Sequence, residues 1–348
     1  MRLVVLVCKL ESNWLTSIDM QIQIFSKRVN SMSGGYQNGF PVFSQSSANP
    51  QTRSDLYDSL HPDHAGSALS GLSHAEKIDL FQQILQRKIH GISFSPYMDG
   101  QSPGHEISEQ QIRERMRIIQ PYTRWIRSFS CIEGNQQTPR IAHELGLKTM
   151  VGVGVGEDKE MNELELANGI EVAKSGHADI LAVGNEVLLR GDISEDELLA
   201  YIDRAKQAVP NVPVGYVDAY FLFENHPRVA EACDVILINC YPFWESCPAE
   251  YALVYMKEMY RRAQRVANGK KVIISETGWP NIGSPYGAAV PGPENALNYF
   301  INTCLWADEE GIEIFYFSSF DESWKVGDEG DVGAYWGLWD KDGNLKYV

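Results

Sequence analysis

The stretch KKVIISETGWPN, residues 270–281, places an acidic residue at the end of a short apolar run. The three apolar residues that start at Val272 have the composition of a buried strand. A Gly-Trp-Pro sequence follows directly, and glycine and proline commonly mark the end of a strand. The strand is therefore expected to end near Glu276. A carboxylate at the end of a buried strand calls for a structural or functional reason.

Seven further runs of similar composition occur in the chain. Most are nearly continuous in apolar residues, which is typical of parallel strands covered on both faces. Together with 272–280, the predicted strands are residues 91–97, 125–131, 149–155, 180–186, 212–220, 235–243 and 312–324.

Amphipathic segments separate these runs. Residues 107–122 place apolar side chains on one helical face, and Ser108 with Gln111 has the spacing of a capping box. Residues 194–209 begin with a second capping box, at Ser194. Eight strands that alternate with helices over about 280 residues predict a (β/α)8 barrel.

A doubly wound sheet is the main alternative fold. Such a sheet carries a glycine-rich phosphate turn between its first strand and the helix that follows. The segment GVGVGED, residues 152–158, resembles this turn, but its glycines lie inside the third predicted strand. The barrel is therefore the preferred fold.

Residues 1–70 differ in composition from the rest of the chain. They are rich in Ser, Gly, Asn and Gln and show no sustained periodicity, which predicts a flexible lead-in. Met32 is a second candidate for the translation start. Residues 71–348 are predicted to form a single barrel domain.

The overall charge limits the choice of partners. The chain has 46 acidic and 30 basic residues among 348, for a net charge of −16. This excess argues against nucleic acid or an anionic membrane surface as a partner. No apolar run reaches the length of a membrane span. We expect a monomer in the cytoplasm, because no clear cleavage site follows the apolar start; export to the periplasm or the medium is the alternative.

Cysteine and histidine show no spacing typical of metal sites. The six cysteines form no CxxC pair and the eight histidines form no HExxH motif. Cys240 and Cys247 could form a disulfide, although reduced thiols are the preferred interpretation. We expect neither a metal nor a cofactor.

Active sites of (β/α)8 barrels lie at the C-terminal ends of the strands. The residues near those predicted ends are mainly carboxylates and aromatics. They are Tyr97, Arg127, Asn185, Glu186, Asp218, Tyr241, Glu276, Trp279, Asp321, Glu322, Trp324 and Lys325.

Glu186 ends the fourth predicted strand and Glu276 ends the seventh. Retaining glycosidases use two carboxyl groups about 5–5.5 Å apart, one as acid/base and one as nucleophile. A single glutamate at a strand end is usually a helix cap or a surface charge. Two glutamates on opposite sides of a barrel mouth instead predict a glycosidase site. Trp279 fits either a stacking platform for a sugar or a core residue.

The motif AVGNEV (182–187), paired with SETGWP (275–280), resembles glycoside hydrolase family 17, the clan A family of β-1,3-glucanases and glucanosyltransferases. The resemblance covers residues 90–348. The segments FYFSSFDESWK (315–325) and GYVDAY (215–220) are closer to fungal cell-wall and bacterial members than to plant members.

The resemblance implies a role for each matching residue. Glu186 is the implied acid/base, and Asn185 is its neighbour that binds the sugar 2-hydroxyl. Glu276 is the implied nucleophile, supported by the hydroxyl of Tyr241. Arg127 is the fixed cation that keeps the nucleophile ionised.

Further residues are expected to bind substrate. Glu322 and Lys325 match an acidic and basic pair at the end of the last strand, although a surface ion pair is the simpler interpretation. Tyr97, Asp218 and Trp279 complete the expected substrate-binding set.

The implied activity is cleavage of β-1,3-glucan by double displacement, with retention of configuration. Transglycosylation is the first alternative, because it shares the first half-reaction and replaces water with a sugar hydroxyl. A catalytically silent glucan-binding barrel is the second alternative, and turnover of laminarin would exclude it.

Overall fold

The computed structural model describes residues 36–37, 40–41, 69, 71–327 and 329–348. The predicted lead-in, including Met32, lies mostly outside the described residues. Within it, β1 (Tyr36–Gln37) and β2 (Phe40–Pro41) pair in antiparallel fashion. Leu69 is buried in the main hydrophobic core, so the core begins before the domain boundary predicted at residue 71.

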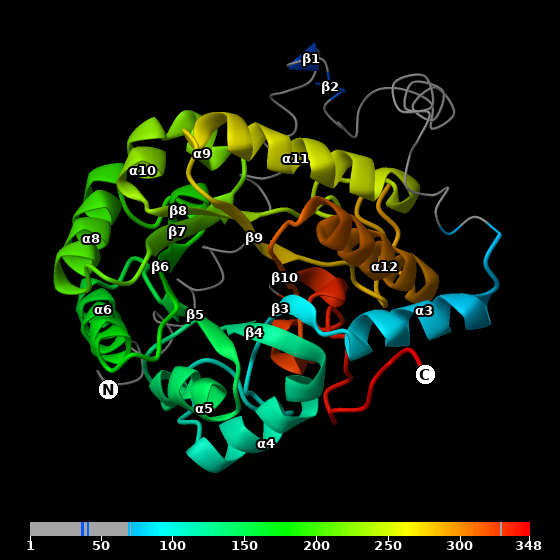
Figure 1. The fold of residues 1–348 in the computed structure, drawn as a ribbon, viewed down its shortest axis with the longest axis horizontal. Helices are drawn as coiled ribbons and strands as arrows, with labels where there is room; N and C mark the ends of the chain where they lie inside the picture. The colour runs from blue at the N-terminus through cyan, green and yellow to red at the C-terminus, as the bar shows by residue number, and fades with distance from the viewer. Residues whose placement is uncertain (1–35, 38–39, 42–68, 70, 328) are drawn as a thin grey trace, which may run out of the picture.

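Eight parallel strands form a closed barrel in the order β10-β3-β4-β5-β6-β7-β8-β9, as Figure 1 shows. This confirms the (β/α)8 prediction and excludes the doubly wound sheet. The strands are β3 (Ile89–Ser93), β4 (Thr123–Arg127), β5 (Lys148–Val153), β6 (Ile180–Asn185), β7 (Val214–Ala219), β8 (Val235–Asn239), β9 (Val272–Thr277) and β10 (Ile314–Tyr316).

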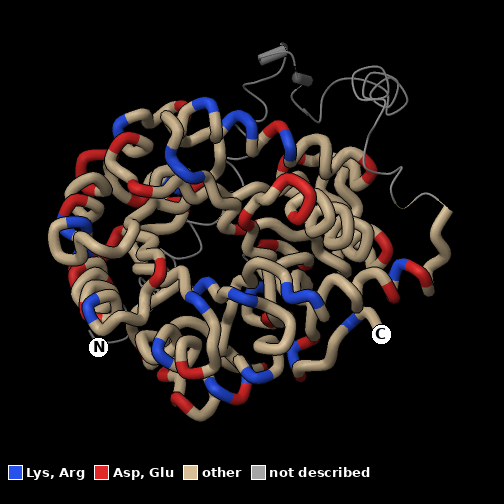
Figure 2. The backbone as a smooth tube through the Cα atoms, in the orientation of Figure 1, with Lys and Arg blue, Asp and Glu red and all other residues tan. Residues whose placement is uncertain are grey.

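Helices surround the barrel, and their outer faces carry both acidic and basic residues (Figure 2). The helices are α3 (His74–Gln86), α4 (Glu109–Ile119), α5 (Thr138–Glu144), α6 (Lys159–Lys174), α7 (Val187–Arg190), α8 (Glu195–Ala208), α9 (Leu222–Asn225), α10 (Pro227–Ala232), α11 (Ala252–Val266) and α12 (Pro293–Glu310). Short 3-10 turns are η2 (Gln120–Tyr122), η3 (Asn135–Gln137), η4 (Ala249–Tyr251), η5 (Ser323–Lys325) and η6 (Gly330–Val332). Among the described residues, no helix combines the length and the apolar character needed to cross a membrane.

The two predicted helix caps differ in detail. Ser194 forms the full capping box at the start of α8, as predicted. Ser108 caps α4, but the side chain of Gln111 donates to the carbonyl of Pro96 at 2.9 Å. The glutamine therefore ties the helix to the loop after β3 instead of completing the box.

The last predicted strand is much shorter than expected. It ends at Tyr316, although the aromatic residues Phe317 and Phe320 follow. Beyond β10 the chain bonds to the C-terminal segment, where the Ser318 amide donates to the Trp336 carbonyl at 3.0 Å. Phe317 and Phe320 are buried as loop residues, so apolar composition here reflects a packed loop and not a strand.

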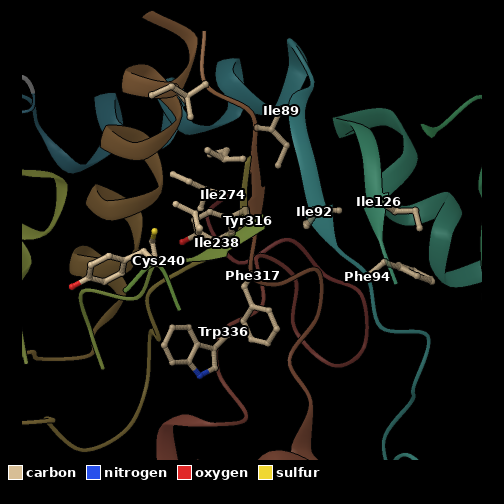
Figure 3. Close-up of a cluster of buried hydrophobic side chains, with 14 of the residues drawn as sticks. Ile89, Ile92, Phe94, Ile126, Ile238, Cys240, Ile274, Tyr316, Phe317 and Trp336 are labelled. Atoms are coloured by element: carbon tan, nitrogen blue, oxygen red, sulfur yellow. The ribbon is translucent and has the colours of Figure 1, made fainter. Parts of the chain in front are cut away.

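Two apolar layers hold the barrel together. One layer fills the space between strands and helices, and Figure 3 shows part of it, with Ile238, Ile274 and Tyr316 beside the strands. The other fills the barrel interior and consists of Met150, Ile180, Ala182, Val217, Val235, Leu237, Ile273 and Phe315. The interior is therefore closely packed with apolar side chains below the mouth.

Candidate active site

A cavity of about 420 Å³ opens at the C-terminal ends of the strands. It contains both Glu186 and Glu276. Its other lining residues come from the ends of β7 and β8 and from the segments after β6 to β10. They are Leu189, Ala219, Phe221, Asn239, Tyr241, Phe243, Trp244, Glu245, Ser284, Pro285, Tyr286, Phe317, Glu329, Gly330, Asp331, Val332 and Trp336.

A register shift in β9 turns Glu276 into the mouth. Ile273 faces the barrel interior and Ile274 faces the helices, so strict alternation would direct Glu276 outward. Ile238 of β8 pairs with Ile274, whereas the next residue, Asn239, pairs with Glu276. The extra residue on β9 has the effect of a β-bulge, which re-aims the side chain that follows.

A second irregularity places Glu186. The pairing of β6 with β7 shifts between Ala182 and Asn185. Gly184 has φ 83°, a left-handed conformation that glycine adopts without steric cost. Glu186 itself has φ 54° and ψ 25°, which is uncommon for a residue with a side chain. Such backbone strain is concentrated at functional sites.

The carboxylate of Glu276 contacts Arg127 and Tyr241, the two residues predicted to be its neighbours. One carboxylate oxygen contacts the guanidinium of buried Arg127, and the other accepts from the Tyr241 hydroxyl at 2.6 Å. Arg127 also donates to Asn185 Oδ1 at 2.9 Å. This guanidinium therefore links the ends of β4, β6 and β9, and it gives Glu276 a fixed positive neighbour.

Glu186 has different surroundings. Its Oε1 accepts from Asn239 Nδ2 at 2.8 Å. Burial and the negative charge of Glu276 raise the pKa of Glu186 above its ordinary value. The two carboxyl groups therefore differ: Glu276 has a guanidinium partner, and the pKa of Glu186 is raised by burial and by the charge of Glu276.

Sequence reasoning missed Asn239. Its Oδ1 accepts from Ser275 Oγ at 2.9 Å, which orients the amide so that its nitrogen faces Glu186. One feature of the sequence could have identified Asn239 as a site residue: it is a polar residue at the end of the apolar strand VILIN, two positions before Tyr241.

Trp279 does not line the cavity, so the prediction of a sugar platform is wrong. Its side chain is 1% exposed and its Nε1 donates to the Val290 carbonyl at 3.0 Å. The ring packs against Phe243 and Tyr299, with ring centroids 5.3 and 5.4 Å away. The alternative interpretation, a core residue, is the correct one.

Asp218 is also displaced from its predicted role in substrate binding. Val217 lies in the interior cluster and Ala219 lines the cavity, so alternation directs Asp218 to the other face of β7. There it is fully buried, accepts from the backbone amides of Leu189 and Ala219, and contacts the Tyr216 hydroxyl. Burial and the charge of Glu186 raise the pKa of Asp218 to about 8.

The remaining predicted residues lie at the mouth but outside the cavity lining. Glu322 and Lys325 form an ion pair of 2.8 Å, and both are buried, which excludes the interpretation as a surface pair. Tyr97 is half-buried and its hydroxyl accepts from Asn135 at 3.3 Å. Its ring meets Trp324 edge-on.

The aromatic walls of the cavity were not predicted. The Trp336 ring lies 5.4 Å from Tyr241 and 5.6 Å from Trp244, and Tyr286 lies 5.5 Å from Trp244. In Figure 3, Trp336 and Phe317 lie together beyond the strands. Tyr286 and Trp336 lie in loops, many residues beyond the ends of β9 and β10, where no strand pattern points to them.

Two further glutamates, Glu245 and Glu329, line the cavity. Burial raises the pKa of each to about 7. Cys240 and Cys247 are buried free thiols, and Cys8 lies outside the described residues. In the described part of the chain, no group of three or more metal-ligating side chains is arranged to hold a metal.

The comparisons with known proteins agree with this geometry. The family model described as "BtgE/BtgC glycoside hydrolase domain" matches residues 91–337. A glucan 1,3-beta-glucosidase of Candida albicans, BGL2, is 28% identical over 255 residues, which are 66% of this chain and 83% of the relative. The cell surface mannoprotein MP65 of the same species is 25% identical and covers 72% of this chain and 66% of its own length.

Among solved structures, a family 17 β-1,3-glucanosyltransferase from Rhizomucor miehei superposes with a TM-score of 0.67 at 26% identity. It covers 75% of this chain and 96% of its own. An active-site mutant of that enzyme, solved with laminaritriose, matches equally well. This chain belongs to the BtgE/BtgC glycoside hydrolases and, as its paired motifs indicated, to glycoside hydrolase family 17.

Proposed function

We propose that this protein cleaves β-1,3-glucan with retention of configuration, using Glu276 as nucleophile and Glu186 as acid/base. The observation that carries the proposal is the contrast within one cavity between a glutamate paired with Arg127 and a glutamate whose pKa is raised. The names of the relatives, a glucan 1,3-beta-glucosidase and a β-1,3-glucanosyltransferase, supply the linkage.

In the first half-reaction, Glu276 attacks the anomeric carbon. Glu186 transfers its proton to the glycosidic oxygen, the bond between that oxygen and the anomeric carbon breaks, and a glycosyl ester of Glu276 remains. The guanidinium of Arg127 and the hydroxyl of Tyr241 hold the attacking carboxylate in one orientation. Asn185, itself fixed by Arg127, is the proposed partner of the sugar 2-hydroxyl.

In the second half-reaction, Glu186 is ionised and accepts a proton from the incoming hydroxyl group. The oxygen attacks the anomeric carbon from the face that the leaving group vacated, and Glu276 is released. Water gives hydrolysis, and a glucan hydroxyl gives transglycosylation. The likeness to the glucanosyltransferase of R. miehei favours transfer as a second activity at this site.

The relatives also bear on location and partners. One of them is a cell surface protein, which does not support the predicted cytoplasmic location and favours the secreted alternative. The proposed partner is a β-glucan oligo- or polysaccharide bound by a monomer. The net charge of −16 gives no support for a nucleic-acid partner.

The test is product analysis on reduced laminari-oligosaccharides, followed by proton NMR from the first minutes. We expect β-anomers to form first and cello-oligosaccharides of equal length to remain uncut. Initial formation of α-anomers would refute the retaining mechanism. Cleavage of β-1,4 links at an equal rate would refute the substrate assignment.

A further inference from the structure

Two side chains on β7 are bonded to the helix that follows β6, and the proposed mechanism uses neither of them. Asp218 is fully buried and does not line the cavity. Its Oδ2 accepts from the backbone amide of Leu189 at 3.3 Å and contacts the Tyr216 hydroxyl. That hydroxyl in turn accepts from the backbone amide of Leu188 at 2.9 Å. The first turn of α7 is therefore attached to the outward face of β7 through a buried carboxyl group and a buried hydroxyl group.

The start of α7 needs this attachment because its own N-cap residue supplies no acceptor. The first backbone amides of a helix have no partners within the helix, and the side chain of the N-cap residue commonly accepts from one of them. In α7 the N-cap residue is Glu186, whose side chain makes no such bond. Its carboxyl group instead lines the cavity and accepts from Asn239. By capping the helix from β7, Asp218 and Tyr216 leave the Glu186 carboxyl group free to face the substrate.

The backbone at Glu186 is strained, so its conformation depends on what surrounds it. The left-handed angles of Glu186, φ 54° and ψ 25°, cost energy and persist only where neighbouring groups hold them. The Glu186 amide donates to the Val217 carbonyl at 2.8 Å, between the two side-chain attachments. Three amides from Glu186 to Leu189 are therefore bonded to residues 216–218 of β7. This set of bonds fixes the direction in which the Glu186 side chain leaves the backbone.

We infer that Asp218, together with Tyr216, is a positioning residue that keeps the carboxyl group of Glu186 in line with the glycosidic oxygen. This inference rests on the proposed function, in which Glu186 is the acid/base. A general acid must lie within hydrogen-bond reach of the oxygen that it protonates. A displacement of about 1 Å, caused by a change remote from the reacting atoms, can lower a rate about 10²-fold. Loss of the attachment to β7 should therefore impair proton donation more than the attack by Glu276.

Glu165 of α6 provides a matched control. It is buried, and like Asp218 it accepts from two backbone amides and one side-chain hydroxyl. The donors to Glu165 are the amides of Cys131 and Gly154, at 2.7 and 3.0 Å, and the hydroxyl of Ser130. None of these four residues lines the cavity. Removing the Glu165 carboxyl group therefore imposes the same kind of cost on folding without changing the attachment of α7 to β7.

The experiment compares Asp218→Ala with Glu165→Ala, and the milder Tyr216→Phe with Ser130→Ala, in the full chain. Two donors are used, dinitrophenyl β-laminaribioside and phenyl β-laminaribioside. Dinitrophenolate departs with little proton assistance, whereas phenolate needs a proton from the acid/base. The measurement is kcat/KM for aryl release, which reports the first half-reaction, and the result is the ratio of the phenyl value to the dinitrophenyl value. Misfolded enzyme lowers both values equally, so this ratio responds to proton donation and not to stability.

Asp218→Ala should lower the ratio by about tenfold or more, because the acid/base is then misplaced. Tyr216→Phe should lower it by a smaller factor, because the carboxyl group of Asp218 remains. Glu165→Ala and Ser130→Ala should keep the ratio within about twofold of the wild-type value, even where the melting temperature falls, because proton donation is intact. Glu186→Gln shows the full effect of a missing acid and should lower the ratio furthest.

An unchanged ratio in Asp218→Ala, while Glu186→Gln lowers it, would overturn the inference and leave the proposed function standing. If Asp218→Ala is insoluble, Tyr216→Phe decides the question, and an unchanged ratio in that variant overturns the inference. An equal fall of the ratio in Glu165→Ala would also overturn it, because any buried carboxyl group would then have the same effect. If the wild-type chain releases neither aryl group, or if Glu186→Gln leaves the ratio unchanged, the proposed function is refuted, and the inference with it.

Discussion

The base and the mouth of the barrel interior are built from the same strands but hold opposite kinds of side chain. On β4, Trp125 packs against the apolar interior cluster, and two residues later Arg127 is buried among acceptors. On β9, Ile273 belongs to the cluster and Glu276 pairs with that arginine. A short distance along one strand therefore separates the residues that hold the fold from those that are placed for chemistry.

Stability and activity should therefore depend on different parts of the barrel. Removing apolar volume at the base leaves a cavity, which lowers the free energy of unfolding. At the mouth, charged groups are buried at a cost in desolvation, and this cost is offset only because each has a specific partner. Changes at the mouth should therefore affect turnover more than folding, and changes in the core the reverse.

The largest expected effect is on turnover at the mouth. Glu186→Gln and Glu276→Gln keep the side-chain shape but cannot exchange a proton or attack carbon. Loss of general acid catalysis alone lowers rates by about 10²–10⁴-fold, so both variants should lose nearly all laminarin turnover. Circular dichroism and thermal melting should show a folded protein in each case. Retained activity in either variant would mean that the pair is structural.

The next largest effect is a loss of stability at Trp279, a core residue close to the mouth of the barrel. Trp279 lies just after the end of β9 but belongs to the packed core, so Trp279→Ala should lower the free energy of unfolding by about 3–5 kcal/mol. Urea denaturation measures this change. A stable variant with weakened glucan binding would restore the interpretation of Trp279 as a sugar platform.

Trp244→Ala should weaken substrate binding and leave the free energy of unfolding nearly unchanged. Its ring is half-buried and lines the cavity, so the loss falls on substrate contact. An aromatic contact of about 1.5 kcal/mol corresponds to a change of about tenfold in KM for laminari-oligosaccharides. Melting temperature serves as the control. A large fall in stability with unchanged KM would place Trp244 in the core instead.

The smallest expected effect is a change in the pKa of Glu186. The charge of Glu276 contributes to the raised pKa of Glu186, together with burial. Glu276→Gln removes that charge, so the pKa of Glu186 should fall while burial still keeps it above the ordinary value. Carbon-13 NMR of labelled glutamate side chains measures this pKa directly. A rise in the pKa, or no change, would mean that the two carboxyl groups are not coupled as described.

The sequence was sufficient for the fold because the barrel follows from local patterns. Apolar runs and amphipathic segments alternate over most of the chain, and each run overlaps one of the eight strands, although β3, β4 and β5 begin one or two residues before the predicted runs. The predicted strands extend past the observed C-terminal ends. The reason is that loop residues such as Phe317 and Phe320 are as apolar as strand residues.

The site was predictable only where it lies on strands. Four of the predicted site residues lie at or just after strand ends, and they lie close together in the structure. They are Glu186, Glu276, Arg127 and Tyr241. The aromatic walls lie on loops whose path depends on tertiary packing. Asp218 was misplaced because the side of β7 on which it lies depends on strand register, which composition does not reveal.

Glu276 and Glu186 are assigned different roles in the reaction, and rescue of their variants by azide distinguishes these roles. The donor is an aryl β-laminaribioside with a good leaving group, so the first half-reaction needs little proton assistance. Glu186→Gln should still form the glycosyl ester on Glu276, and azide should release it as the β-glycosyl azide. Glu276→Ala has no nucleophile, so azide can attack only directly and should give the α-product. A β-azide from the Glu276 variant and an α-azide from the Glu186 variant would reverse the assignment of nucleophile and acid/base.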